Sequence, residues 1–147
     1  MLKHKISILL LACIILVPPS QCTGQAATGQ IAPGQPAVLP EVVSHQAKRH
    51  VEQGNVYFSQ GAYSKAIKEY TAAIELNPRL AEAYVSRGKA YYFTLGATAK
   101  TDDDLLKAIE LDPKSAVAYY YLGLSNAATG AYDRAIADFS KAVEFDK

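Results

Sequence analysis

The feature that most constrains this sequence is a motif that occurs three times at a nearly constant spacing. Residues 66–78 read AIKEYTAAIELNP, the end of that motif returns as KAIELDP at 107–113, and AIADFSKAVEFD occupies 135–146. Ile74, Ile109 and Val143 hold equivalent places, 35 and 34 residues apart. A fixed period in this range predicts structural units that stack on one another, each covering the apolar face of its neighbour.

A glycine recurs at one position of every copy. These glycines are Gly54, Gly88 and Gly123. Glycine in a helix interior costs about 1 kcal/mol relative to alanine, so its repeated use predicts a close approach between helices. Ala66 and Ala135 are the expected small counterparts on the second helices. Thr101 is the bulkier equivalent in the middle copy, where we expect looser packing.

These glycines and alanines, with tyrosines and prolines in the same register, resemble the tetratricopeptide repeat, a pair of antiparallel helices. The resemblance implies an all-α, right-handed solenoid of three helix-turn-helix repeats at about 47–80, 81–115 and 116–147. We expect helices at 41–60, 63–76, 80–95, 102–111, 115–129 and 132–145, and no strands. The middle copy has one extra residue within 89–95, which predicts a widened turn or a π-bulge there.

The N-terminal segment has the layout of a secretory signal peptide, which we place at residues 1–22. A basic start is followed by an apolar run at 6–17, which is short for a membrane span, and then by Pro18 and Pro19. We therefore expect a bacterial exported protein, periplasmic or secreted. A lipoprotein anchored through Cys13 or Cys22 is one alternative, with Cys22 better placed after the apolar run, and a leader retained as a membrane anchor is another.

Residues 23–40 are rich in Gly, Gln, Pro and Ala and carry no charge, which predicts a flexible linker before a folded domain at 41–147. The chain has a formal net charge of +1, and loss of Lys3 and Lys5 with the leader would make it −1. This balance argues against nucleic acid as a partner and leaves a lipid anchor as the expected route to a membrane.

No motif for catalysis, metal binding or a cofactor stands out, so we predict neither an enzyme nor a metal or cofactor site. The run Asp102–Asp104 lacks further oxygen ligands nearby in sequence. We expect instead that Thr101 caps a helix, with Asp104 in the capping-box position. Arg87 should form a structural ion pair with Glu69 or Asp104, a role that the resemblance suggests.

The resemblance also implies a concave groove lined by the first helices of the repeats. Carried over copy by copy, the groove residues are Lys48, Val51, Asn55, Phe58, Val85, Lys89, Tyr92, Phe93, Val117, Tyr120, Tyr121 and Leu124. Such an aromatic and apolar surface favours a protein or peptide partner, although about half of the rings could belong to the core. The family's clamp for a C-terminal carboxylate is matched only at Asn55.

The function predicted from these features is a protein-binding or peptide-binding scaffold that acts outside the cytoplasm. Two alternatives stay open. One is a lipid-anchored assembly factor of the cell envelope. The other is a structural module that self-associates through its C-terminal edge, where Val143 and Phe145 continue the apolar stripe.

Overall fold

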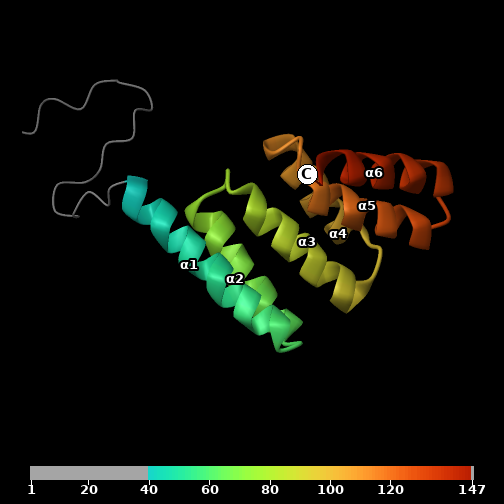
Figure 1. Ribbon diagram of the computed structural model, residues 1–147. Coiled ribbons are helices and arrows are strands. Elements are labelled where there is room, and N and C mark those ends of the chain that lie inside the picture. Colours follow the sequence, from blue (N-terminus) through green and yellow to red (C-terminus); the bar gives the residue numbers. More distant parts are fainter. Residues whose placement is uncertain (1–39, 147) are drawn as a thin grey trace, which may run out of the picture. The chain divides into compact units, whose positions relative to one another are not determined.

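The computed structural model describes residues 40–146, which form six α-helices and no strand (Figure 1). The helices are α1 (Pro40–Ser59), α2 (Tyr63–Leu76), α3 (Ala81–Leu95), α4 (Ala99–Leu111), α5 (Ala116–Ala128) and α6 (Tyr132–Phe145). The prediction of an all-α fold of three helix-turn-helix repeats is confirmed. The predicted leader, both cysteines and residues 23–39 of the predicted linker lie outside the described residues. Across the described part, each helix is too short or too polar to span a bilayer.

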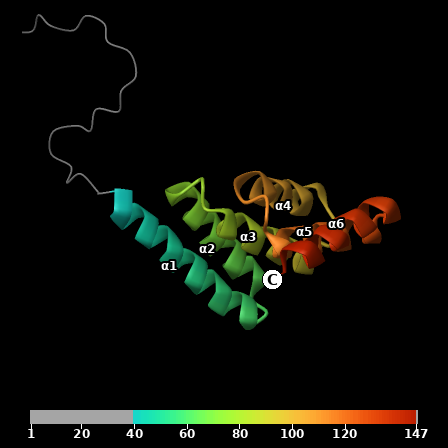
Figure 2. The ribbon, with the colours of Figure 1, turned by 45° about the horizontal axis from the view of Figure 1, so that its top comes forward.

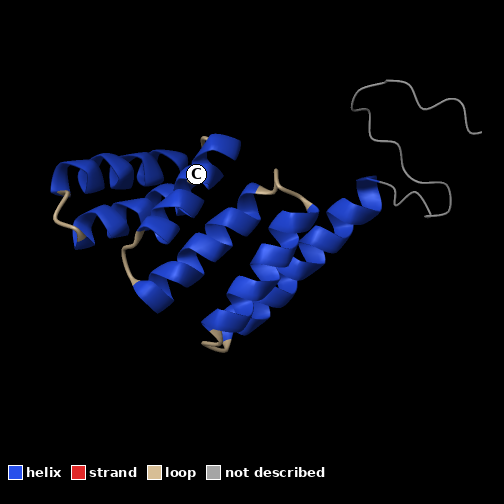
Figure 3. Ribbon diagram, turned by 180° about the vertical axis from the view of Figure 1, so that it is seen from behind, coloured by secondary structure: helices blue, strands red, loops and turns tan. Residues whose placement is uncertain are grey.

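The three helix pairs follow one another in chain order, with α1 and α6 at opposite ends of the domain (Figures 1 and 2). Short turns separate the two helices of each pair (Figure 3). In the first turn Gly61 has a φ of +72°, and in the third Gly130 has a φ of +80°. This left-handed conformation, which suits glycine, reverses the chain, and the amide of Ala62 donates to the Tyr57 carbonyl at 2.9 Å.

The middle repeat absorbs its extra residue in a way that the sequence did not predict. α3 is regular α-helix from Ala81 to Leu95, so no π-bulge is present there. The turn at 96–98 is as long as those at 60–62 and 129–131, but its glycine, Gly96, comes first instead of second. The extra residue therefore lengthens α3 beyond its glycine and changes the geometry of the turn. The predicted π-bulge and the predicted widened turn were therefore both wrong.

Thr101 does not cap α4, because the helix begins earlier, after Thr98. Thr101 lies in the first turn, fully buried, and its Oγ1 donates to the Gly96 carbonyl at 2.9 Å. The side chain that stands where the other repeats have alanine thus satisfies a backbone group of the altered turn. The expected capping-box role of Asp104 is also wrong, since its carboxylate binds Arg87.

The recurrent glycines make room for a large side chain of the second helix. A Cβ on Gly54 would lie 2.4 Å from the ring of Tyr70, and one on Gly123 would lie 2.7 Å from the ring of Phe139. At Gly88 the neighbour is Leu105, at 3.0 Å, so the middle pair leaves slightly more space. The expected counterparts Ala66 and Ala135 are buried, but the rings one helical turn further on lie over the glycines.

Each later first helix packs into the notch between the two helices of the preceding repeat. Ala83 and Ala90 of α3 share a buried cluster with Val51, Tyr70 and Ala73 of the first repeat. In the same way, Ala118 and Leu122 of α5 share a cluster with Leu105 and Ala108 of α4. The core is therefore continuous from repeat to repeat, as stacked units require.

Candidate functional site: an aromatic strip and an end pocket

Aromatic side chains from three repeats form a connected strip, which we call the aromatic strip. Its members are Phe58, Tyr63, Tyr92, Phe93, Tyr120 and Tyr121. The Phe93 ring centre lies 5.5 Å from those of Phe58 and Tyr63 and 6.4 Å from that of Tyr121. Tyr120 continues the strip at 5.3 Å from Tyr121. These separations are in the range at which aromatic rings attract one another.

The aromatic strip is partly exposed and partly supported by the core. Phe93 is 50% exposed and Tyr120 is 48% exposed. Tyr121 is half-buried, and burial raises the pKa of its hydroxyl. Tyr63 was not predicted as a site residue because it begins a second helix, whereas the resemblance assigns the groove to first helices. Its place beside the turn brings its ring to Phe58 and Phe93.

One cation lies against this strip. Lys89 Nζ is 4.4 Å from the ring centre of Phe58 and 5.9 Å from that of Tyr121, so it makes cation–π contacts with two repeats. Among the described residues, no carboxylate forms an ion pair with Lys89. Its charge therefore has no acidic partner within that part of the chain, and it can meet an acidic group of a ligand.

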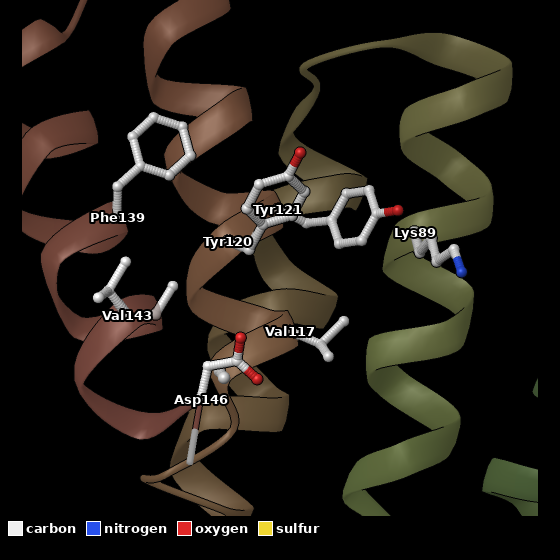
Figure 4. Close-up of a pocket in the computed structure, with 9 residues that line it drawn as sticks. Lys89, Val117, Tyr120, Tyr121, Phe139, Val143 and Asp146 are labelled. Atoms are coloured by element: carbon white, nitrogen blue, oxygen red, sulfur yellow. The ribbon is translucent and has the colours of Figure 1, made fainter.

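A cavity of about 470 Å³ opens at the C-terminal end of the domain, and we call it the end pocket (Figure 4). It is lined by Lys89, Ala116, Val117, Tyr120, Tyr121, Phe139, Ala142, Val143 and Asp146. Phe139 and Val143 of α6 lie across from Tyr120 and Val117 of α5, with Lys89 of α3 on the far side. Four predicted groove residues (Lys89, Val117, Tyr120 and Tyr121) thus converge here.

Other predicted groove residues lie elsewhere. Val51 is 2% exposed and belongs to the first core cluster, so it cannot line an open groove. Val85 is half-buried against the second cluster. Lys48 is exposed, and Leu124 is half-buried. Asn55 is exposed, but its Oδ1 accepts a hydrogen bond from the Tyr70 hydroxyl at 2.8 Å.

The predicted C-terminal edge is only partly open. Val143 is 75% exposed, as an unpaired edge requires. Phe145 instead turns back onto α5, where its ring centre lies 5.7 Å from that of Tyr119. The exposed apolar face of α6 is formed by Tyr132, Ile136 and Val143.

Arg87 forms an ion pair with Asp104, one of the two acids expected as its partner. Its Nε donates to Asp104 Oδ2 at 2.7 Å, and its Nη2 donates to Oδ1 at 2.8 Å. A third hydrogen bond, from Nη1 to Thr71 Oγ1 at 3.1 Å, reaches the preceding repeat. The hydrogen bonds with Asp104 raise the pKa of the Arg87 guanidinium. Glu69, the alternative partner, lies 2.8 Å from His50 Nδ1 instead.

The three consecutive aspartates, Asp102 to Asp104, do not converge on one site. Asp104 binds Arg87, and Asp102 accepts a hydrogen bond from the Ser125 hydroxyl of α5. Asp103 is exposed. Across residues 40–146, no group of three His, Cys, Asp or Glu side chains comes together in a way that could hold a metal ion.

Three family models match overlapping parts of the domain. A model described as TPR repeat matches residues 54–93, and two described as tetratricopeptide repeat match 81–115 and 105–137. A search of curated proteins found no match.

Many solved structures are similar to the domain. The second TPR of Spaghetti (RPAP3), bound to the HSP90 peptide SRMEEVD, is 26% identical with a TM-score of 0.67, over 70% of this chain and 94% of that one. The Arabidopsis OM64 TPR domain is 28% identical with a TM-score of 0.68, over 71% and 85%. The TPR2B domain of yeast Sti1, in a pHsp70 complex, is 27% identical with a TM-score of 0.65, over 69% and 81%. The three repeat models, which together span residues 54–137, and the three helix pairs make the chain a tetratricopeptide repeat protein.

Proposed function

We propose that this protein is a scaffold that reversibly binds a protein or peptide partner through the aromatic strip. The observation that carries the proposal is the continuity of the strip across all three repeats with Phe93 and Tyr120 half-exposed. Rings that are already packed lose little conformational freedom on binding and supply large apolar area, which suits them to anchor a partner.

The similar structures support this class of activity. The RPAP3 domain is bound to an HSP90 peptide, and the yeast Sti1 domain is in a complex with pHsp70. Those two ligands are not proposed for this protein. Of the family's carboxylate clamp only Asn55 is matched, and its side chain is held by Tyr70. The ligand that fits better carries apolar or aromatic side chains for the strip and an acidic group for Lys89.

The test begins with affinity capture from the native extract by the 41–147 domain, followed by calorimetry with the purified partner. The double variant Tyr92→Ala/Phe93→Ala should weaken binding by at least about tenfold, because truncating an aromatic anchor removes about 1 kcal/mol or more. The matched control is Tyr132→Ala, a tyrosine of α6 that is 67% exposed and outside the strip. Equal affinity of the double variant and the wild type, with both folded by circular dichroism, refutes the proposal.

We further propose that the protein acts outside the cytoplasm, on the grounds of its predicted leader. Lipid anchoring at Cys22 would make it an envelope assembly factor instead. The intact mass of the protein purified from its native host separates the two. A chain that begins at Thr23 without added mass indicates soluble export, and a diacylated Cys22 indicates an anchor. An unprocessed N-terminus contradicts both.

The third role, self-association at the C-terminal edge, is supported by the exposure of Val143 but not by Phe145, which covers Tyr119. No catalytic role is proposed.

A further inference from the structure

The end pocket occupies a position that is filled in the other two repeats. Its floor residues are equivalent, copy by copy, to residues that receive the first helix of the next repeat. The three equivalent sets are Val51, Tyr70, Ala73 and Ile74; Val85, Leu105, Ala108 and Ile109; and Tyr120, Phe139, Ala142 and Val143.

The coverage of these sets differs sharply. Val51, which shares a cluster with α3, is 2% exposed, whereas its equivalent Tyr120 is 48% exposed. Ile74 and Ile109 are half-buried against their clusters, whereas their equivalent Val143 is 75% exposed. The end pocket is thus a helix-receiving notch without its helix among the described residues.

The two helices that fill the equivalent notches share one sequence feature. α3 presents Ala83 and Ala90, and α5 presents Ala118 and Ser125, and all four residues are at most 1% exposed. Residues seven apart lie on one face of a helix, about two turns from each other. Small side chains at both places let the helix backbone sink between the two helices of the preceding repeat.

We propose that the end pocket binds an amphipathic α-helix of a partner protein that carries two small residues seven positions apart, flanked by larger apolar side chains. The inference rests on the proposed protein-binding function. It adds that the ligand is a helix and that the binding surface includes α6, whereas an extended peptide would lie along the aromatic strip. The precedent is internal, since the same fold accepts such a helix twice.

A second copy of the chain fits less well. The face of α1 that corresponds to Ala83 and Ala90 carries Arg49 and Val56. Both side chains are bulkier than the small pair, so α1 of another copy could not approach α5 and α6 as closely as α3 approaches α1 and α2. Head-to-tail stacking of copies is therefore disfavoured on shape.

The test uses the 147-residue protein and a synthetic peptide of residues 79–96, held helical by a staple away from Ala83 and Ala90. In ¹H–¹⁵N spectra, the peptide should shift resonances around Tyr120, Phe139 and Val143. A peptide with Ala83→Leu and Ala90→Leu should bind at least about tenfold more weakly. Val143→Glu in the protein should have the same effect, and it should fold because Val143 is largely exposed. Leu106→Glu, on α4 and 53% exposed, is the control that should bind normally.

Several results would overturn the inference. Equal binding by the two peptides would show that the small pair is not required. Equal binding by a third peptide, in which a proline breaks the helix, would show that a helix is not required. Shifts confined to residues around Val51 would mean that the peptide displaces α3. A wild-type dimer that Val143→Glu converts to a monomer would assign the pocket to a second copy. If the wild-type protein does not bind the helical peptide but still binds its partner through Tyr92 and Phe93, this inference fails and the proposed function stands.

Discussion

Arg87 of α3 holds Asp104 of α4 through two hydrogen bonds, at 2.7 and 2.8 Å, and Asp104 is 6% exposed. The other repeats also place an acid at this position. Glu69 meets His50 at 2.8 Å, and Asp138 accepts a hydrogen bond from Asn126 Nδ2 at 2.8 Å. Every repeat thus ties its second helix to its first through one carboxylate, although the partner residue and its place on the first helix change.

Loss of Arg87 should be strongly destabilising, because it leaves the Asp104 carboxylate buried without a counter-charge. For Arg87→Ala we expect a loss of about 3–5 kcal/mol in the free energy of unfolding, measured by urea denaturation. The double variant Arg87→Leu/Asp104→Leu should recover most of this loss, since an apolar pair needs no desolvation of charge. If the double variant is as unstable as Arg87→Ala, the ion pair is not the source of the effect.

Gly54 should tolerate alanine less well than its helical position suggests. Alanine would gain about 1 kcal/mol of helix propensity, but its Cβ would lie 2.4 Å from the Tyr70 ring. We expect a net destabilisation of about 1–3 kcal/mol for Gly54→Ala, because a buried ring has to move. Tyr70→Leu, which copies the Gly88–Leu105 pair, should make Gly54→Ala nearly neutral in that background. Thermal unfolding of the four proteins in this cycle measures the coupling, and strict additivity would contradict a steric cause.

Stability should fall at high pH through Tyr70. Burial raises the pKa of its hydroxyl from 10.0 to about 12. The folded state therefore favours the neutral hydroxyl. The contribution of this preference to the free energy of unfolding is fully present below pH 10 and is lost as the pH rises from 10 to 12. The difference corresponds to about 3 kcal/mol.

Tyr70→Phe provides the control for this titration. At pH 7 the variant should be less stable by about 1 kcal/mol, because it lacks the hydrogen bond to Asn55. Above about pH 11 the order should reverse, because phenylalanine does not ionise. Urea denaturation at a series of pH values would show the crossing, and parallel curves for the two proteins would rule out Tyr70 as the titrating group.

Spacing was sufficient to predict the helices apart from the start of α4, since the period, the glycines and the Asn77-Pro78 and Asp112-Pro113 breaks all carry local information. It was less informative about which side chains stay open. Val51 and Tyr120 occupy equivalent positions, yet one is covered by α3 and the other lies in the end pocket. That difference depends on whether another helix packs against the repeat, which equivalence between copies does not encode. Phe145 was predicted on the open edge but packs on Tyr119, a tertiary contact that the spacing between copies does not encode either.

The middle repeat gives the last prediction, because its departures from the other two compensate for one another. The extra residue puts Gly96 first in the turn, and the Thr101 hydroxyl donates to its carbonyl. Thr101→Val keeps the volume but removes the donor from a fully buried site, so we expect a loss of about 1–3 kcal/mol. Thr94→Val is the matched control, since Thr94 also donates to a backbone carbonyl, that of Ala90, but is exposed. It should change stability by less than about 0.5 kcal/mol. Similar losses for both variants would show that the effect is one of helix propensity and not of the buried hydrogen bond that accommodates the extra residue.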